Sequence, residues 1–246
     1  MCVFGRTVLA LADFTFRSYL QMAIRPLLAW DCIMELARDL MHLRSSNALE
    51  GASQSDRESF HRVFWICSIL LHELEAILKM YPIGLRQFHE VVPLPLTNSE
   101  DEGFFYFLAQ ASLRKLLTET LDVVGYRVGQ IVYAPIVVAE LCKQIEEWYD
   151  HLPPPIRFPN NSSPLFDLRK SFLRFQYFAL HTVIFWPSLL QYLEICSEGN
   201  GDSNAAKMQI LQKEVRIWVQ RCIMSCECAE ELLVQRHLGL QFTLWA

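Results

Sequence analysis

The chain has 246 residues, 52% of them hydrophobic, which is enough for a substantial buried core in one large domain or two small ones. Its 22 basic and 27 acidic residues give a net charge of −5, and the lysines and arginines form no cluster. Proteins that bind the phosphate backbone usually carry a basic patch, because counterion release supplies most of their affinity. This composition therefore argues against direct nucleic-acid binding by the chain itself.

The cysteines and the longest apolar runs indicate an intracellular protein. The eight cysteines lie mostly inside apolar segments, which favours buried thiols in a reducing compartment over a disulfide framework. Asp13 and Arg17 interrupt the N-terminal apolar run, so we expect no signal peptide. Polar residues and Pro187 interrupt the most apolar window, residues 172–193, so we expect no membrane span.

Apolar residues recur at three- and four-residue spacing along most of the chain, and strand-like alternation is nearly absent. This pattern predicts an all-α fold, organised as a single multi-helix domain of roughly seven or more helices. Ser99 with Glu102 makes a capping box before the fourth expected helix, and Ser163 with Pro164 is a typical start for the sixth. The expected helices are, in chain order, residues 4–22, 27–43, 57–80, 100–124, 134–150, 164–196 with a bend at Pro187, and 204–237.

Expected helix 57–80 is apolar around most of its circumference but carries two kinds of polar position. Helical spacing places one polar stripe along it, formed by Ser68, His72, Glu75 and Lys79 with Trp65 above them. Glu73 lies on the opposite, apolar side. Because an unpaired buried charge costs several kcal/mol, we expect Glu73 to be at least two-thirds buried, with a cation or donor within about 4 Å.

Two interpretations of Glu73 stay open. In the first, it forms a buried ion pair that fixes helix register, and the basic residues available on expected helices are Arg114, Lys115, Arg169 and Arg174. In the second, Glu73 and its partner line a cavity for a small effector, because a few convergent polar groups in an apolar pocket are typical of ligand sites.

Catalytic and metal-binding motifs do not emerge from the sequence. Cys222 and Cys226 lie one helical turn apart, but Cys228 is displaced to another side, so the three thiols are interpreted as structural. His72 and Glu73 resemble the start of a zinc-protease motif whose second histidine is replaced by Ala76. Phosphate-binding glycine loops, a nucleophile elbow and a magnesium-binding aspartate run are also missing from the sequence. We therefore expect a protein that is not an enzyme and that holds no cofactor or metal.

Residues 57–96 combine an Arg-x-Phe-Trp core at Arg62, Phe64 and Trp65, an acidic residue at Glu73, and a proline-containing exit at 91–96. This order resembles the regulatory, or middle homology, region of fungal binuclear zinc-cluster transcription factors. The resemblance continues upstream at 29–43 and downstream through 105–121, 139–158 with Trp148, and 173–190 with Pro187. It is clearest over 20–240 and assigns residues 1–246 to that regulatory domain, incomplete at both ends.

The sequence departs from the family in two respects that limit what can be carried over. The zinc cluster needs six cysteines in paired CxxC units, and no CxxC occurs in this chain. Zinc and direct DNA binding are therefore expected only in an N-terminal cluster outside this sequence. Trp186 precedes Pro187 where the family commonly has arginine, so a contact made by that arginine is not carried over.

The resemblance implies a function in transcription regulation, exerted through protein contacts or effector binding. It implies a location in the nucleus and partners among other transcription proteins, with a small-molecule effector and a homodimer as further partner classes. One alternative is a cluster-less interaction protein with no DNA role of its own. The other is an all-α enzyme of secondary metabolism, which would need the clustered aspartates or cofactor motif that the sequence lacks.

Overall fold

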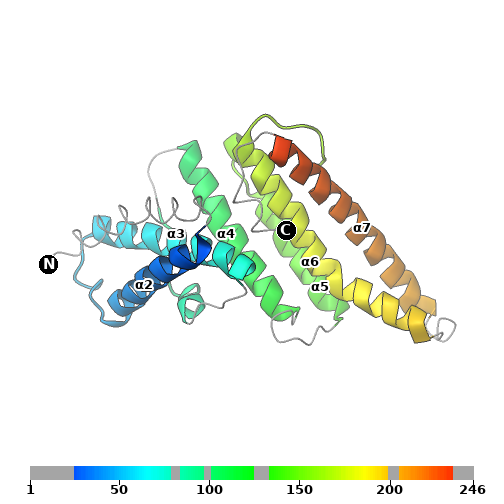
Figure 1. Cartoon of the computed structure of the whole chain (residues 1–246), viewed down its shortest axis with the longest axis horizontal. Helices are drawn as coiled ribbons and strands as arrows, with labels where there is room; N and C mark the ends of the chain where they lie inside the picture. The colour runs from blue at the N-terminus through cyan, green and yellow to red at the C-terminus, as the bar shows by residue number, and fades with distance from the viewer. Residues whose placement is uncertain (1–24, 79–83, 97–100, 125–132, 199–204, 235–246) are drawn as a thin grey trace. The chain divides into compact units, whose positions relative to one another are not determined.

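The computed structural model describes residues 25–78, 84–96, 101–124, 133–198 and 205–234. These residues form helices and connecting segments without strands, which confirms the all-α fold class (Figure 1). They hold six of the seven expected helices, and the remaining one, 4–22, lies outside the described residues. The helices are α2 (Pro26–Ser45), α3 (Gln54–Leu78), α4 (Glu102–Val123), α5 (Pro135–Asp150), α6 (Leu168–Glu198) and α7 (Ala205–Val234), with short 3₁₀ helices η1 (Leu85–Phe88) and η2 (Pro154–Ile156).

An aspartate caps the N-terminus of both α4 and α6, whereas the sequence suggested a serine cap for each helix. The Asp101 carboxylate accepts a hydrogen bond from the backbone N–H of Gly103 at 3.3 Å and so caps α4, while Ser99 lies outside the described residues. The prediction that α6 begins at Ser163 and Pro164 is wrong. Asp167 caps that helix instead, because its Oδ1 accepts hydrogen bonds from the backbone N–H groups of Arg169 at 2.9 Å and Lys170 at 3.3 Å.

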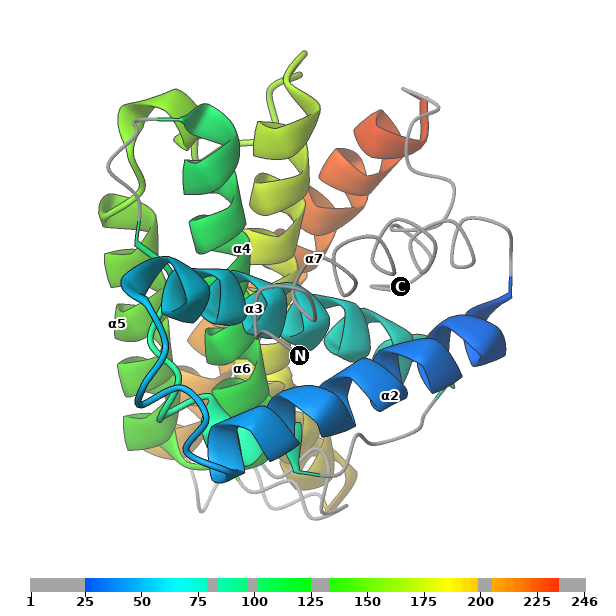
Figure 2. The same cartoon turned by 90° about the vertical axis from the view of Figure 1, so that its left-hand side faces the viewer.

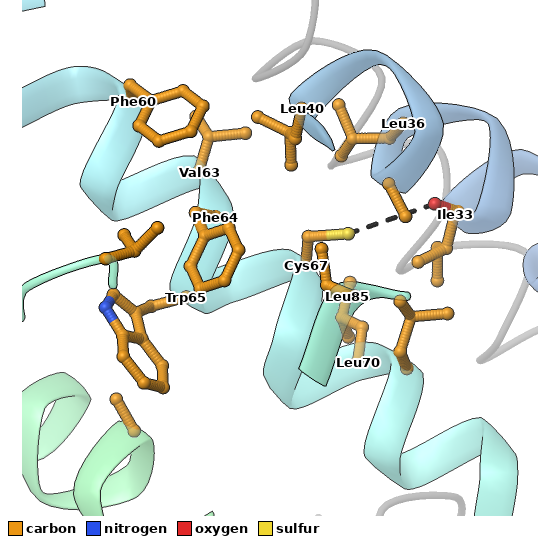
Figure 3. Packing of buried hydrophobic residues seen from close by; sticks show 14 of the residues in the cluster. Ile33, Leu36, Leu40, Phe60, Val63, Phe64, Trp65, Cys67, Leu70 and Leu85 are labelled. Carbon is orange, nitrogen blue, oxygen red and sulfur yellow. Dashed lines mark hydrogen bonds between the residues drawn. The ribbon is translucent and has the colours of Figure 1, made fainter. Parts of the chain in front are cut away.

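The described residues belong to two compact units, and the division falls inside α4, between Ala111 and Ser112. The expectation of a single domain stays a prediction. In the first unit α2 packs against α3 (Figure 2), and the apolar stripes of both helices meet in one core. Figure 3 shows Ile33, Leu36 and Leu40 of α2 facing Val63, Cys67 and Leu70 of α3, with Leu85 of η1 beside them. Burial of side chains of this size stabilises the fold by about 1.5–3 kcal/mol each.

In the second unit α6 is the central element. Every residue from Ser171 to Phe178 is buried, so this part of α6 has neighbours on all sides. α5 and α7 both contact α6, and Figure 1 shows α6 and α7 side by side and antiparallel. α6 runs without a break through Pro187, which is itself buried. Within the described part of the chain, no helix is long and apolar enough to cross a membrane.

Candidate functional site

The polar stripe of α3 is covered by the segment that follows η1. The Ser68 hydroxyl and Nε2 of His89 form a hydrogen bond of 2.7 Å, and both side chains are buried. One turn further along α3, the Nδ1–H of His72 donates to the Ser68 carbonyl at 2.7 Å, and the ring centroids of His72 and His89 are 5.5 Å apart. We call Trp65, Ser68, His72 and His89 the His89 cluster. Ser68, His72 and Glu75 of the predicted stripe are therefore buried, and Ser68 meets the segment that follows η1, while Lys79 lies outside the described residues.

Trp65 fixes the proline-containing exit against α3. Its indole N–H donates to the Pro93 carbonyl at 3.0 Å, and its ring stacks on His89 with centroids 5.2 Å apart. Phe64 packs edge-on against His89 at 5.9 Å, and Figure 3 shows Phe64 and Trp65 pointing away from the α3 axis in different directions. Direct contact thus joins Trp65 to the proline-containing exit at 91–96. In the sequence the two were separate features of one motif.

Arg62 begins the Arg-x-Phe-Trp core but, unlike Phe64 and Trp65, does not lie in the packed interior. It is exposed, and its guanidinium lies 5.2 Å from the ring centroid of Phe104 at the start of α4. A cation–π contact at an exposed site contributes about 0.5–1 kcal/mol, much less than the burial of Phe64 or Trp65. Arg62 therefore remains available to solvent on one side, whereas Phe64 and Trp65 belong to the core.

Glu73 is 4% exposed, so the burial predicted for it is present. Of the four basic residues considered as its partner, Arg174 is engaged elsewhere, in a salt bridge of 2.7 Å with Glu231. Lys115 pairs with Glu119 at 3.8 Å on α4, and Arg169 is exposed. Arg114 is 3% exposed. The identity of the group that pairs with Glu73, and a cavity beside it, stay predictions.

The salt bridge between Arg174 and Glu231 was not anticipated from the sequence. Arg174 is fully buried, and its Nη1 donates to the carbonyls of Asn161 at 2.9 Å and Ser163 at 2.6 Å. The Glu231 carboxylate also accepts a hydrogen bond from the backbone N–H of Leu165. Arg174 of α6 and Glu231 of α7 thus hold the connector between α5 and α6 in place. The signal available in the sequence was an arginine inside the aromatic run of α6, which requires a partner once buried.

Trp148 contacts two other helices of its unit, as expected. Its indole N–H donates to the Ser112 hydroxyl of α4 at 2.9 Å, and its ring stacks with Tyr177 of α6 at a centroid distance of 6.3 Å. Tyr149 beside it donates to the Phe158 carbonyl at 2.6 Å. Burial raises the pKa of Tyr177 to about 12, so this phenol stays neutral. Trp148, Tyr149 and Phe158 therefore pack their rings against Tyr177 and join α5 and the segment after it to α6.

Trp186, which stands where the resembling family has arginine, contacts α7. Its ring lies 5.9 Å from that of Trp218, whose indole N–H donates to the Thr182 carbonyl at 3.1 Å. His181, the residue just before Thr182, carries a buried imidazole that bonds to the Tyr177 carbonyl one turn earlier, and burial lowers its pKa to about 4. An apolar contact between α6 and α7 thus occupies the position of the family's arginine.

The geometry limits the chemistry available at these positions. A serine and a histidine at 2.7 Å have the spacing of an activated nucleophile, but here Ser68 is 1% exposed and its hydroxyl is enclosed by the protein. On α7, Cys222 is half-buried, Cys226 exposed and Cys228 buried, so the Cys228 thiol points to a different side of the helix from Cys226. Among the residues described, no three histidine, cysteine or acidic side chains are grouped to hold a metal ion.

Comparison with known proteins identifies one informative similarity. A segment of 105 residues is 31% identical to a protein of Aspergillus rugulosus named "Putative transcription factor ecdB", and it covers 39% of this chain. The matched segment spans 19% of that protein, about a fifth of its length. No protein-family model matches the chain, and no solved structure matches it.

Proposed function

We propose that the chain is a helical control region of a fungal zinc-cluster-type transcription factor. The observation that carries the proposal is the 31% identity over 105 residues to a protein named as a transcription factor. The contact between Trp65 and Pro93 adds support, because it joins two features of the regulatory-region motif within one packed core. The proposal places the protein in the nucleus, with other transcription proteins as partners.

In this proposal the chain regulates and a separate region binds DNA. The chain lacks a basic cluster and any CxxC pair, which a zinc cluster needs. Control is exerted through protein contacts or through an effector that binds one helix arrangement better than another. The buried carboxylates Glu73 and Glu75 on α3 would respond to such a rearrangement, since exposing or unpairing a buried charge changes stability by several kcal/mol.

A reporter assay tests the regulatory role directly. The 246-residue chain is tethered to a heterologous DNA-binding domain in yeast, and expression from a promoter with the matching site is measured. We expect expression to change relative to the DNA-binding domain alone. The variant Trp65→Ala should abolish this change by disrupting the first core, whereas the exposed substitution Arg169→Ala should preserve it. An expressed, nuclear fusion that leaves the reporter unchanged would contradict the proposal.

DNA binding measured across a salt series tests whether the DNA contacts belong to a region separate from this chain. The chain alone should show no tight, salt-sensitive binding, because its lysines and arginines form no cluster that could replace counterions along the phosphate backbone. A fusion to a zinc cluster from a related regulator should bind with a clear salt dependence. Tight binding by the chain alone would contradict the assignment of DNA contacts to a separate region.

A further inference from the structure

The outward side of α7 carries a stripe that the packing of the second unit does not use. Leu211, Cys228 and Leu232 lie on the buried side of the helix. At 100° per residue, Val219 and Ile223 fall on the opposite side, where they are 44% and 53% exposed. Val219 and Ile223 thus lie one turn apart on the side of α7 that the packing of the second unit leaves exposed.

Charges are distributed unequally along this stripe. Lys213 and Arg216 lie in its first half, and Glu227 and Glu230 lie in its second half, all of them exposed. None of the four has a salt-bridge partner within the described ranges. The exposed positions 209, 213, 216, 220, 223, 227 and 230 on this side of α7 are spaced alternately by four and three residues, as in the seam of a coiled coil. We call the exposed residues 209, 212, 213, 216, 219, 220, 223, 226, 227 and 230 the outer stripe.

Two shallow, open hollows lie between the side chains of α7 along the outer stripe, and each is lined by α7 residues alone. One, of about 260 Å³, is lined by Gln209, Gln212, Lys213 and Arg216 together with their neighbours. The second hollow, of about 330 Å³, is lined by Arg216, Val219, Gln220 and Ile223 together with their neighbours. Each set follows the spacing i, i+3, i+4, i+7, which is the arrangement of four residues that receives a side chain from a facing helix.

We propose that the outer stripe is the interface of a homodimer in which two α7 helices pack antiparallel around a two-fold axis between residues 221 and 222. This register places Lys213 of one copy opposite Glu230 of the other and Arg216 opposite Glu227. Ile223 lies opposite Gln220 and enters the second hollow, while Glu230 enters the first, between Lys213 and Arg216. The apolar residues therefore meet in the centre and each charge meets its opposite.

The charge order argues for a second copy of the chain and for one orientation. An interface with two-fold symmetry must be complementary to itself, and this stripe contains an opposite charge at the symmetric position of each of its own charges. Parallel packing would place Lys213 against Lys213 and Glu230 against Glu230, and juxtaposed like charges are strongly unfavourable at an interface. The inference holds or fails independently of a role in transcription.

Analytical ultracentrifugation of the full chain, over about 1–200 μM, tests the dimer with charge-reversal variants. We expect the wild type to dimerise, more weakly at high salt because exposed charges are screened. Lys213→Glu with Arg216→Glu, or Glu227→Lys with Glu230→Lys, should each raise the dissociation constant at low salt at least about tenfold through repulsion. All four substitutions together should restore the dimer, because the reversed stripe is again complementary to itself.

A matched control separates the interface from net charge. Arg25→Glu with Arg169→Glu makes the same change in net charge at exposed positions outside α7 and should leave dimerisation unchanged. Circular dichroism establishes that every variant is helical. A wild-type chain that stays monomeric throughout the concentration range overturns the proposal, as does a dimer that the α7 reversals do not weaken. Weakening by both double variants without recovery in the quadruple variant overturns the antiparallel register.

Discussion

Ser68 and His89 lie 21 residues apart in the chain, and their side chains meet in a buried hydrogen bond of 2.7 Å. The bond joins the middle of α3 to the segment that follows η1, where Trp65 stacks on the same imidazole. Both side chains are buried, so a partner lost from this bond leaves a polar group with little access to water. The bond therefore contributes to the stability of the first unit and to the position of the proline-containing exit.

Ser68→Ala should lower the free energy of unfolding by about 1–3 kcal/mol, because it removes a buried hydrogen bond and leaves a gap beside His89. Urea denaturation followed by circular dichroism measures the loss. The exposed Ser197 on α6 is a matched control, since its hydroxyl donates to the Glu194 carbonyl of its own helix. Equal stability of Ser68→Ala and Ser197→Ala would contradict a structural role for the His89 cluster.

Arg174→Met should destabilise the second unit by about 3–5 kcal/mol, because it leaves Glu231 without its cation and two carbonyls of the connector without donors. Arg157→Met is the control. Arg157 pairs with Asp150 at the surface, with side chains 44% and 73% exposed, and its loss should cost less than about 1 kcal/mol.

A double-mutant cycle assigns the effect to the pair. Replacing both partners, Arg174→Met with Glu231→Leu, should cost less than the sum of the two single changes, since neither then leaves an isolated charge. Thermal and urea unfolding of the four proteins supply the coupling energy. Additive single effects would mean that Arg174 acts through its bonds to the connector alone.

His181 should make stability depend on pH in the weakly acidic range. Burial lowers its pKa from an ordinary value of 6.5 to about 4, so the unfolded state binds more protons between these values. Stability is complete above pH 6.5 and decreases as the pH falls, by about 2 kcal/mol between pH 7 and pH 5 from this residue. Burial also lowers the pKa of His61, which adds a smaller loss in the same direction.

The variant His181→Gln isolates this contribution. Its stability should fall by less than that of the wild type between pH 7 and pH 5, measured as the difference in unfolding free energy at the two pH values. His151→Gln changes an exposed histidine and should retain the wild-type pH dependence. If the unfolding free energy of His181→Gln fell with pH as steeply as that of the wild type, a group other than His181 would cause the pH dependence.

The cysteines of α7 should differ in reactivity. Cys226 is exposed, whereas Cys228 is buried, and burial raises the pKa of the Cys228 thiol. Cys142 is half-buried, and burial with nearby acidic groups raises its pKa to about 12. At pH 8 and low protein concentration, iodoacetamide should label Cys226 at least about tenfold faster than Cys142 or Cys228, because the thiolate is the reactive form.

Mass spectrometry of peptides from the labelled protein gives the individual rates. In denaturant all the thiols should label at similar rates, which provides the reference for each site. Equal rates for Cys226 and Cys228 in the native protein would contradict the burial of Cys228 and the continuity of α7 through this region.

The sequence by itself determined the helices, because a helix depends on spacing that is local along the chain. The expected segments 27–43, 57–80, 100–124, 134–150, 164–196 and 204–237 all correspond to observed helices, with ends displaced by four residues or fewer. The burial of Glu73 followed from the same periodicity. The start of α6 was misplaced because Ser163 and Pro164 have the composition of a helix start, whereas their backbone is held by Arg174.

Only the tertiary structure decided which polar groups meet. Ser68 pairs with His89, and Arg174 pairs with Glu231, 57 residues away, because these segments are brought together by packing that helical periodicity does not encode. The same holds for α7, whose sequence has apolar residues on more than one side. Packing buries Leu211 and Leu232 and leaves Val219 and Ile223 exposed, and this choice creates the outer stripe. Local spacing fixes a helix, but the burial of its faces depends on partners distant in the chain.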